Sequence, residues 1–507
     1  MKIILKHRIS VILILLSSVP FLDTDAQTIE KPNVIIINTD DLGYGDLSAY
    51  GATEIKTPHI DALAENGIRF TNGHATSATC TPSRYALLTG EYPWRRDTKI
   101  LPGDAALIIP TDKTTVPSLF QKAGYATGIV GKWHLGLGKT LEKDWNKPIT
   151  PGPNEVGFDY SFIFPATADR VPTVFMENGL VLGLEADDLI GVNYKEAIGN
   201  DPTGISNPEL LKMRASPNHG HNNTIVNGIG RIGYMTGGQK ARWTDEEVPI
   251  TFLVKAKDFI QKNKNKPFFL YYALTEPHVP RMPSTIFKGK SKLGYRGDAI
   301  LQIDWAVGEI TKQLKALGIE KNTIIIFTSD NGPVLNDGYV DYAVEMNGKH
   351  RPAGPLRGGK YSAFEGGSRV PFIISWPGNI EASISDALVC QVDFLRSFAH
   401  LIKQPLSEEQ GQDSQNTLSA FLGQSKQGRD ILIKQGGALS VTKGRWKYIT
   451  PNPGVAVAKL TNIETGNSKE DQLYNLKEDL SEQNNVAKQH SEKVAELKQI
   501  LSQTTSP

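Results

Sequence analysis

The chain has 507 residues, of which 39% are hydrophobic and 21% are charged. This is an ordinary globular composition, and the length exceeds what one hydrophobic core needs, so we predict a large domain and a smaller one. The 55 basic and 54 acidic residues leave a formal net charge of +1. This balance gives no reason to expect a nucleic-acid partner or an anionic membrane surface, so any attraction for an anionic substrate must be local.

The N-terminal segment predicts export. Three Lys or Arg residues within the first eight precede an apolar stretch at 9–22, and small residues follow just before Gln27. This pattern is typical of a secretory signal peptide over residues 1–26, and the apolar stretch is short for a membrane-spanning helix. We therefore expect a periplasmic or secreted protein without a stable membrane anchor.

The region 27–425 has the pattern of one large α/β domain. Continuous apolar runs predict strands that are buried on both faces, at 34–38, 126–130, 268–274, 323–327 and 370–375. Helical patterns separate them, at 57–67, 116–122 and 300–317. This repeated order predicts a large mixed, mostly parallel sheet flanked by helices on both faces.

Two other regions have a different character. The Gly- and Pro-rich stretch 140–250 has little periodicity, which is typical of surface loops or of binding-site walls. After residue 425, short strands are predicted at 431–434, 438–442, 446–449 and 472–476, before a helix at 491–501. Residues 426–507 are therefore predicted to form a smaller α+β subdomain with an antiparallel sheet.

Two polar pairs stand at the carboxyl ends of predicted strands. Asp40 and Asp41 follow the first strand, and Asp330 and Asn331 follow the strand at 323–327. Each pair alone is more commonly a solvated turn. However, ligands of open α/β sheets gather at the carboxyl ends of strands, and three carboxylates with one amide suit calcium or magnesium better than zinc. Together the pairs predict one divalent metal site.

The two cysteines have different surroundings. Cys390 lies in the apolar run 387–390, which is typical of a buried small hydrophobic residue. Cys80 lies among Thr, Ser, Pro and Arg, where packing gives little reason for a thiol. Because a disulfide framework normally uses several bridges, Cys80 requires a chemical explanation.

Cys80 begins the sequence Cys-Thr-Pro-Ser-Arg, which Leu-Thr-Gly follows at 88–90. This segment resembles the Cys-x-Pro-x-Arg motif of type I sulfatases in the alkaline-phosphatase-like superfamily, where the cysteine becomes formylglycine. The resemblance implies that Cys80 is converted in the same way, by a formylglycine-generating or an anaerobic sulfatase-maturating enzyme.

Further segments resemble the same family in the expected order, so that the resemblance covers nearly the whole mature chain. They lie at 131–136, 277–280, 358–367, 444–448 and 473–476. Taken singly, their lysines and histidines are better explained as solvated charges and hydrogen-bonded structural residues. The ordered set outweighs that explanation.

The resemblance implies a calcium-dependent, arylsulfatase-like sulfuric ester hydrolase. A hydroxyl of the formylglycine hydrate would attack sulfur, and the second hydroxyl would let the aldehyde re-form as sulfate leaves. The implied metal ligands are Asp40, Asp41, Cys80, Asp330 and Asn331.

The implied catalytic residues are Cys80, Arg84, Lys132, His134, His278 and Lys360. Arg84 and His134 would orient and deprotonate the nucleophile. Lys132, Lys360 and His278 would hold sulfate oxygens or protonate the leaving group, and the general acid is either His278 or Lys360.

The substrate is predicted less sharply. The segment 166–172 resembles bacterial sulfatases similar to N-acetylgalactosamine-6-sulfatase. Its Asp169 and Arg170 would either contact sugar hydroxyls or form a structural ion pair, and His219 and His221 are weaker candidates. We expect a sulfated glycan that is cleaved at a galactose-type 6-position.

Two other functions fit parts of the pattern. A phosphate or phosphonate monoester hydrolase could use the same scaffold and formylglycine, although ten histidines and no assignable second-metal motif argue against a two-zinc phosphatase. A non-catalytic glycan-binding relative would result if Cys80 stayed unmodified.

Overall fold

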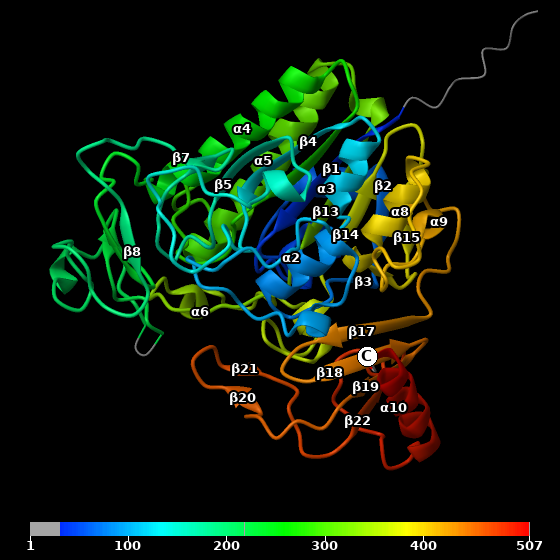
Figure 1. Ribbon diagram of the computed structural model, residues 1–507. Coiled ribbons are helices and arrows are strands. Elements are labelled where there is room, and N and C mark those ends of the chain that lie inside the picture. The colour runs from blue at the N-terminus through cyan, green and yellow to red at the C-terminus, as the bar shows by residue number, and fades with distance from the viewer. Residues whose placement is uncertain (1–30, 217–218, 506–507) are drawn as a thin grey trace, which may run out of the picture.

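The computed structural model describes residues 31–216 and 219–505 (Figure 1). The predicted signal peptide, residues 1–26, lies outside these ranges. Within them, no helix combines the length and the apolar character that crossing a membrane requires.

A ten-stranded mixed sheet forms the centre of the larger body, in the order β15-β2-β14-β13-β1-β12-β4-β5-β6-β7. Its parallel centre comprises β13 (Thr323–Ser329), β1 (Asn33–Thr39), β12 (Phe268–Ala273), β4 (Ala126–Lys132) and β5 (Tyr160–Phe164). The flanking strands are β14 (Phe372–Ser375), β2 (Gly67–Phe70), β15 (Ser383–Ser385), β6 (Met176–Glu177) and β7 (Leu180–Val181). Of these, β14 is antiparallel to β13 and to β2, and β6 is antiparallel to β5 and to β7. The predicted mixed, mostly parallel sheet is confirmed.

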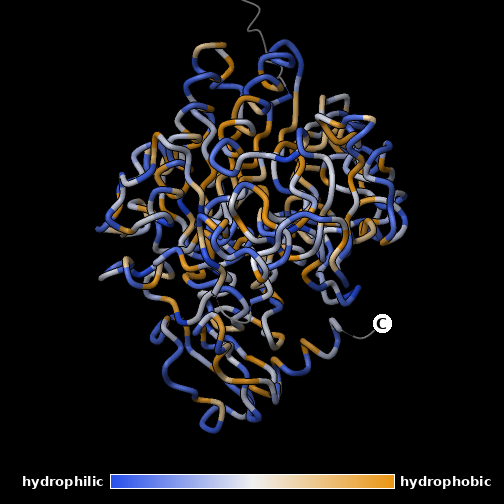
Figure 2. Tube along the Cα trace, turned by 90° about the vertical axis from the view of Figure 1, so that its left-hand side faces the viewer, coloured by the Kyte–Doolittle hydropathy of each residue, from blue (hydrophilic) through white to orange (hydrophobic). Residues whose placement is uncertain are grey.

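Helices cover both faces of this sheet. Successive side chains of β1 alternate between them: Val34 and Ile36 belong to one hydrophobic core, and Ile35 and Ile37 to the other. The first core is completed by α2 (Cys80–Thr89), α3 (Val116–Lys122) and α8 (Phe394–Leu401). The second is completed by α1 (Pro58–Glu65), α4 (Val248–Asn263) and α5 (Gly294–Ala316). Hydrophobic segments accordingly run through the middle of the larger body (Figure 2).

The remaining elements of the larger body are short. The helices are α6 (Ala343–Met346), α7 (Glu365–Ser368) and α9 (Leu418–Phe421). The strand pairs are β3 (Gly73–His74) with β16 (Val389–Cys390), β8 (Gly191–Asn193) with β11 (Tyr234–Thr236), and β9 (Ile225–Val226) with β10 (Ile229–Gly230). The last two pairs lie in the region 140–250, so part of that stretch has regular structure although its sequence shows little periodicity.

A second sheet forms the lower body in Figure 1. Its antiparallel strands are β17 (Ile431–Gln435), β18 (Leu439–Lys443), β19 (Trp446–Ile449) and β22 (Gln472–Asn475), in that order, and α10 (Ser491–Thr505) packs against them. A small hairpin of β20 (Val457–Ala458) and β21 (Ile463–Glu464) precedes β22. The core of this body includes Ala86 of α2 and the buried Cys390, so it is continuous with the larger body. The predicted C-terminal antiparallel sheet is confirmed.

Candidate active site

The tips of two neighbouring strands carry the two predicted polar pairs. Because β1 and β13 pair with Thr39 opposite Ser329, the next residues of both strands emerge at one level of the sheet. Asp40, Asp41, Asp330 and Asn331 all lie there, fully buried. The backbone N–H of Asp41 donates to Oδ1 of Asp330 at 3.4 Å, and Nδ2 of Asn331 donates to Oδ1 of Asp41 at 2.7 Å. The structure therefore brings the four side chains together.

Cys80 is the first residue of α2 and is 2% exposed. Burial raises the pKa of its thiol, and Lys132 and Lys360 offset this only in part, so the unmodified thiol is protonated at neutral pH. One turn further along α2, Nε of Arg84 donates to Oδ2 of Asp330 at 2.8 Å. This charge-assisted bond ties the helix that carries residue 80 to the strand tips.

Two buried lysines face the carboxylates. Nζ of Lys132 donates to Oδ2 of Asp40 at 2.5 Å. Nζ of Lys360 lies 2.9 Å from Oδ2 of Asp41 and 2.8 Å from Oδ2 of Asp337. Burial opposes the charge on Lys360, but the two carboxylates outweigh burial and hold its pKa well above the ordinary value. Lys360 is therefore a fixed positive charge.

Lys132 reaches the site because β4 packs closely against β12. Gly131 has a φ of 120°, and a Cβ there would lie 1.9 Å from the carbonyl oxygen of Ala273. Only glycine fits this close backbone approach. The strand thus continues to Lys132, two residues beyond the predicted end at 130.

Both candidate histidines are buried and neutral. Burial, with Lys360, lowers the pKa of His278 to about 4, and burial, with Lys132, lowers that of His134 well below its ordinary value. Nδ1 of His278 lies 2.7 Å from the carbonyl oxygen of Val279, and its Nε2 lies 3.8 Å from Oδ2 of Asp41. Nε2 of His134 lies 2.9 Å from the carbonyl oxygen of Leu101. Its buried Nδ1 has no hydrogen-bond partner among the described residues and can accept a proton.

The carboxylate cluster has the properties of a cation site. Asp40, Asp41 and His278 each offer a ligand atom within 4.8 Å of the others. In the described part of the chain, Oδ1 of Asp40 and Oδ1 of Asn331 are buried without a hydrogen-bond partner. Burial, together with Asp40, raises the pKa of Asp330 to about 6. Because unpaired buried oxygens are costly, a hard cation such as calcium fits this donor set.

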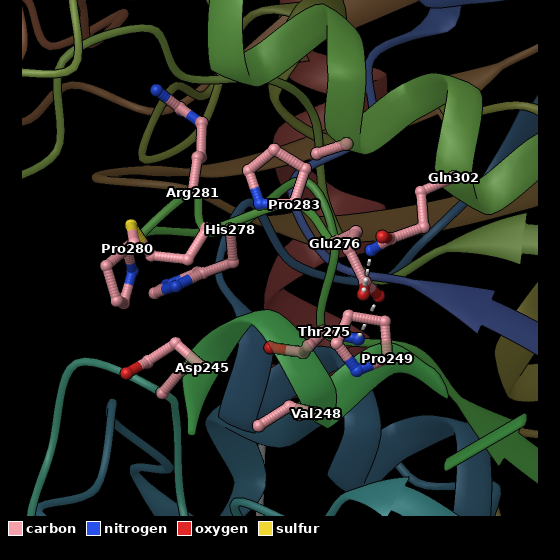
Figure 3. Close-up of a pocket in the computed structure, with 13 residues that line it drawn as sticks. Asp245, Val248, Pro249, Thr275, Glu276, His278, Pro280, Arg281, Pro283 and Gln302 are labelled. Atoms are coloured by element: carbon pink, nitrogen blue, oxygen red, sulfur yellow. Dashed lines mark hydrogen bonds between the residues drawn. The ribbon is translucent and has the colours of Figure 1, made fainter. Parts of the chain in front are cut away.

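A small pocket with polar and apolar lining residues adjoins His278 (Figure 3). It has a volume of about 20 Å³, and Asp245, Arg281 and Pro283 are among its lining residues. At its far end, Nε2 of Gln302 donates to Oε1 of Glu276 at 3.0 Å. A volume of this size holds about one water molecule, so the pocket does not serve as the substrate site.

The substrate-contact candidates lie beside the catalytic groups. Nη1 of Arg170 is 3.0 Å from Oδ1 of Asp169, and Nε2 of His221 is 3.0 Å from Oδ2 of Asp169. Asp169 and Arg170 therefore do form an ion pair. The charge of Arg170 contributes to the pKa of His134, and that of Asp169 to the pKa of His278, so the ion pair lies within electrostatic range of both candidate histidines. His219 is half-buried, with its ring 6.1 Å from that of His221.

Residues 32–403 match the model of the sulfatase family. The chain belongs to the sulfatase family. It is 53% identical over 480 residues to the N-acetylgalactosamine-6-O-sulfatase of Bacteroides thetaiotaomicron, with 94% of each chain covered. It is 30% identical over 437 residues to human steryl-sulfatase, covering 80% of this chain and 73% of the relative.

This sulfatase is also similar to a solved structure from work on the metabolism of multiple glycosaminoglycans by Bacteroides thetaiotaomicron. The TM-score is 0.92 at 52% identity, with 94% of this chain and 99% of the other covered. The resemblance to sulfatases and the alkaline-phosphatase-like fold are therefore confirmed, and the protein is a sulfatase.

Asp337 is a residue of the sulfatase site that is absent from the predicted set. It accepts hydrogen bonds from Nζ of Lys360 at 2.8 Å and from the hydroxyl of Tyr361 at 3.2 Å. In the sequence it stands in Asn336-Asp337-Gly338, which is typical of a turn. Its contact with Lys360 spans 23 positions, and no local pattern signals such a contact.

Proposed function

We propose that this sulfatase removes a 6-sulfate group from an N-acetylgalactosamine or galactose-type unit of a sulfated glycan. It would do so with a formylglycine derived from Cys80 and one calcium ion. The observation that carries this proposal is the convergence of Cys80, the four metal-ligand candidates and two buried lysines at one edge of the sheet. The 53% identity to an N-acetylgalactosamine-6-O-sulfatase supports the substrate class.

Asp40, Asp41, Asp330 and Asn331 would hold the calcium ion beside residue 80. The two unpartnered buried oxygens, on Asp40 and Asn331, support this assignment. When bound, the ion would supply positive charge that lowers the pKa of a hydroxyl on the converted residue and neutralises the adjacent carboxylates.

The two lysines would hold the non-bridging sulfate oxygens. Negative charge is spread over such oxygens in the transition state, and fixed positive groups in a water-poor site stabilise it most effectively. Lys132 and Lys360 are fully buried and anchored on carboxylates, so little reorganisation is needed. The leaving alcohol would take its proton from Lys360 or from His278, and in the second case the negative charge of the bound sulfate ester would have to raise the pKa of His278 so that it carries the proton.

Arg84 and His134 would act on residue 80 itself. Arg84 is fixed by Asp330 and stands one turn along the same helix, so it would orient the nucleophile. Nδ1 of His134 is buried and unpartnered within the described ranges, so it would take the proton that the hydrated residue loses.

The Asp169 cluster would recognise the sugar ring. Asp169, Arg170 and His221 combine acceptor and donor groups beside the catalytic centre, which is the arrangement that fixes a polar ligand. The ion pair between Asp169 and Arg170 would then orient both groups for sugar hydroxyls, and His219 would lie further out.

Export and maturation belong to the same proposal. Residues 1–26 would direct the chain to the periplasm or the exterior. Conversion of Cys80 would require a formylglycine-generating or an anaerobic maturating enzyme as a partner. The catalytic domain would span 27–425 and the smaller subdomain 426–507, with the division between α9 and β17.

Release of inorganic sulfate from a panel of sulfated sugars tests the substrate. The panel holds 6-sulfated N-acetylgalactosamine and galactose, 4-sulfated N-acetylgalactosamine and 6-sulfated N-acetylglucosamine, with a phosphate and a phosphonate monoester as controls. We expect the highest kcat/KM on the two galacto-configured 6-sulfates. A preference for the 4-sulfate or for the gluco-configured sugar would overturn the proposed substrate, and preferred hydrolysis of a phosphorus ester would favour the rival activity.

A further inference from the structure

The loop that carries Lys360 lies between the catalytic centre and the C-terminal sheet. We call residues 357–367 the Lys360 loop. On its inner side, the N–H of Lys360 donates to the carbonyl oxygen of Pro333 at 2.9 Å, and the N–H of Tyr361 donates to that of Ala78 at 2.8 Å. These bonds join the loop to the segment after Asn331 and to the segment before Cys80.

The outer side of the Lys360 loop is bonded to the C-terminal body. The N–H of Ala363 donates to the carbonyl oxygen of Thr465 at 2.8 Å, and Oγ of Ser362 donates to that of Glu464 at 2.6 Å. The guanidinium of Arg357 forms an ion pair with the Glu464 side chain at 2.6 Å. The loop is thus held from both sides.

Four buried charges form the strongest of these connections. Oε1 of Glu365 lies 2.5 Å from Nζ of Lys434 and 3.0 Å from Nζ of Lys447. Nζ of Lys447 lies 2.8 Å from Oε1 of Glu482, whose Oε2 accepts the N–H of Glu365 at 2.6 Å. We call these residues the Glu365 cluster, and each side chain is at most 2% exposed. A buried carboxylate is tolerable only when it is paired, so the lysines of β17 and β19, together with Arg369 at 3.3 Å from its Oε2, determine where Glu365 can lie.

The segment that directly follows Glu365 packs closely on the earlier part of the Lys360 loop. A Cβ on Gly366 would lie 2.5 Å from the carbonyl oxygen of Arg357, and a Cβ on Gly367 would lie 2.1 Å from that of Ser362. The two ends of the loop are therefore packed directly on each other. A displacement of Glu365 would be passed along the loop to Lys360.

The strand that supplies Lys434 also holds the segment before the nucleophile. The N–H of Gln435 in β17 donates to the carbonyl oxygen of Thr76 at 2.9 Å, and the N–H of Ala78 donates to that of Gln435 at 2.8 Å. One strand of the C-terminal sheet is thus attached to the segment leading to Cys80 and, through Lys434, to the Lys360 loop.

We propose that Glu365 is a positioning residue for sulfate transfer: held by Lys434 and Lys447 of the C-terminal sheet, it sets the place of Lys360 relative to residue 80. The inference rests on the proposed function, in which Lys360 holds a sulfate oxygen. The C-terminal sheet then belongs to the catalytic apparatus although it supplies no group that touches the substrate. A misplacement of about 1 Å at a reacting centre costs about 10²-fold in rate, so such support has a measurable value.

The test is a double-mutant cycle between positions 365 and 360, with sulfate release as the readout. Glu365→Gln is expected to lower kcat by about 10- to 100-fold while KM changes by less than about 3-fold, because a displaced Lys360 loses mainly transition-state contacts. In a Lys360→Met background, the same change is expected to lower kcat by less than about 2-fold, because the group it positions is already gone.

Asp393→Asn is the matched control. Asp393 forms a buried ion pair with Arg429 and so also joins 27–425 to 426–507. Among the described residues, its side chain bonds to Arg429 and to the N–H of Gln415, and not to the Lys360 loop or the segment before Cys80. This variant is expected to keep kcat within about 3-fold of wild type. If Glu365→Gln does not fold, Lys434→Met serves in its place, because Glu365 then keeps its pairing with Lys447. We expect Lys434→Met to lower kcat by about 3- to 10-fold, and to have little effect in the Lys360→Met background.

The possible outcomes separate the two proposals. A converted wild-type protein that releases no sulfate from any sugar refutes the proposed function. An active wild type in which the losses at 365 and 360 multiply, or in which Glu365→Gln matches Asp393→Asn, refutes the positioning role alone. Loss at 365 that disappears in the Lys360→Met background supports it.

Discussion

Two buried charge clusters contact the Lys360 loop: the strand-tip carboxylates at Lys360, and the Glu365 cluster at Glu365. They differ in how completely their oxygen atoms are paired. In the Glu365 cluster, each carboxylate oxygen of Glu365 and Glu482 lies within 3.3 Å of a cationic or N–H group, although Oε1 of Glu482 and Nζ of Lys447, 2.8 Å apart, form an ion pair without hydrogen-bond geometry. At the strand tips, Oδ1 of Asp40 and Oδ1 of Asn331 have no hydrogen-bond partner among the described residues. Every carboxylate oxygen of the first cluster thus lies beside a cation or an N–H group, whereas, in the described part of the chain, the second cluster has two oxygens without such a neighbour.

The pKa shifts are mixed within each cluster: the pKa of Asp41 is lowered at the strand tips, and burial raises the pKa of Glu482 in the Glu365 cluster. The clearest contrast is between Glu365 and Asp330. Burial opposes ionisation of Glu365, yet Lys434 and Lys447 outweigh it and hold its pKa well below the ordinary value. Burial and the neighbouring Asp40 instead raise the pKa of Asp330 to about 6. Carboxylates that repel one another in a dry site are stabilised by a bound cation. The comparison teaches that similar charged residues can form a closed structural support or an open ligand site, and that the unpaired oxygens distinguish them.

Replacing the candidate nucleophile should have the largest effect. In a host whose maturating enzyme oxidises cysteine but not serine, Cys80→Ser keeps a single hydroxyl and forms no aldehyde hydrate. We then expect sulfate release at best as a slow, sub-stoichiometric burst, with multiple turnover reduced on the order of 10³-fold or more. Burst amplitude per enzyme and steady-state rate measure this directly. Normal multiple turnover by Cys80→Ser would contradict the role of residue 80.

Removing a ligand from the open cluster should have the next largest effect. Asp40→Asn is expected to lower kcat by about 10²-fold or more and to abolish the rise in Tm on adding calcium, because binding to the folded state alone stabilises it. The Asp393→Asn control should keep the calcium-dependent rise in Tm. An equal rise in Tm on adding calcium in Asp40→Asn and in wild type would contradict the assignment of the strand-tip cluster as the calcium site.

The sugar contacts should matter selectively. Asp169→Ala is expected to lower kcat/KM on a 6-sulfated galacto-configured sugar by about 10- to 100-fold, because lost hydrogen bonds to a charged group cost about 1.5–3 kcal/mol. On a small aryl sulfate without the sugar, the loss should stay within about 3-fold. Equal losses on both substrates would assign Asp169 to maintaining the catalytic centre, through its bond to His221, instead of to the sugar.

Asp304 is a buried carboxylate outside both clusters, and we expect it to have a small effect on the pH dependence of stability. It accepts the N–H groups of His59 and Ile60 at the start of α1, and burial raises its pKa from the ordinary 3.8 to about 6. Between these values the unfolded chain loses the proton and the folded chain keeps it, so stability falls as pH rises from about 4 to about 6. In urea titrations between about pH 4 and pH 6, the free energy of unfolding of wild type should fall by about 1–3 kcal/mol more than that of Asp304→Asn. A constant difference between the two proteins would refute the shift.

Much of the fold could be predicted because its determinants are local. The apolar runs at 34–38 and 323–327 correspond to fully buried central strands, and the pairs Asp40-Asp41 and Asp330-Asn331 follow them directly. Parallel strands then carry their carboxyl ends to one edge of the sheet. The convergence of these pairs is therefore a consequence of the parallel strand arrangement, which the alternation of predicted strands and helices along the chain already indicates.

The remaining contacts depend on distances that no local pattern records. Asp337 pairs with Lys360 across 23 positions, and Lys434 pairs with Glu365 across 69. In the sequence, Asp337 is typical of a turn, and Lys434 is a charged residue that directly follows the apolar run 431–433, where a side chain that faces solvent is expected. Only the packing of the C-terminal sheet on the larger body shows that Lys434 is buried.

The central claim is that the open cluster lies beside a converted Cys80, and the mass of the peptide containing residue 80 tests it most directly. Protein purified from a host with a maturating enzyme is divided, one part being assayed for sulfate release and the other digested for mass spectrometry. We predict that the active protein carries an aldehyde without sulfur at position 80, in proportion to its activity. Sustained turnover by protein whose Cys80 is an intact thiol would contradict the account.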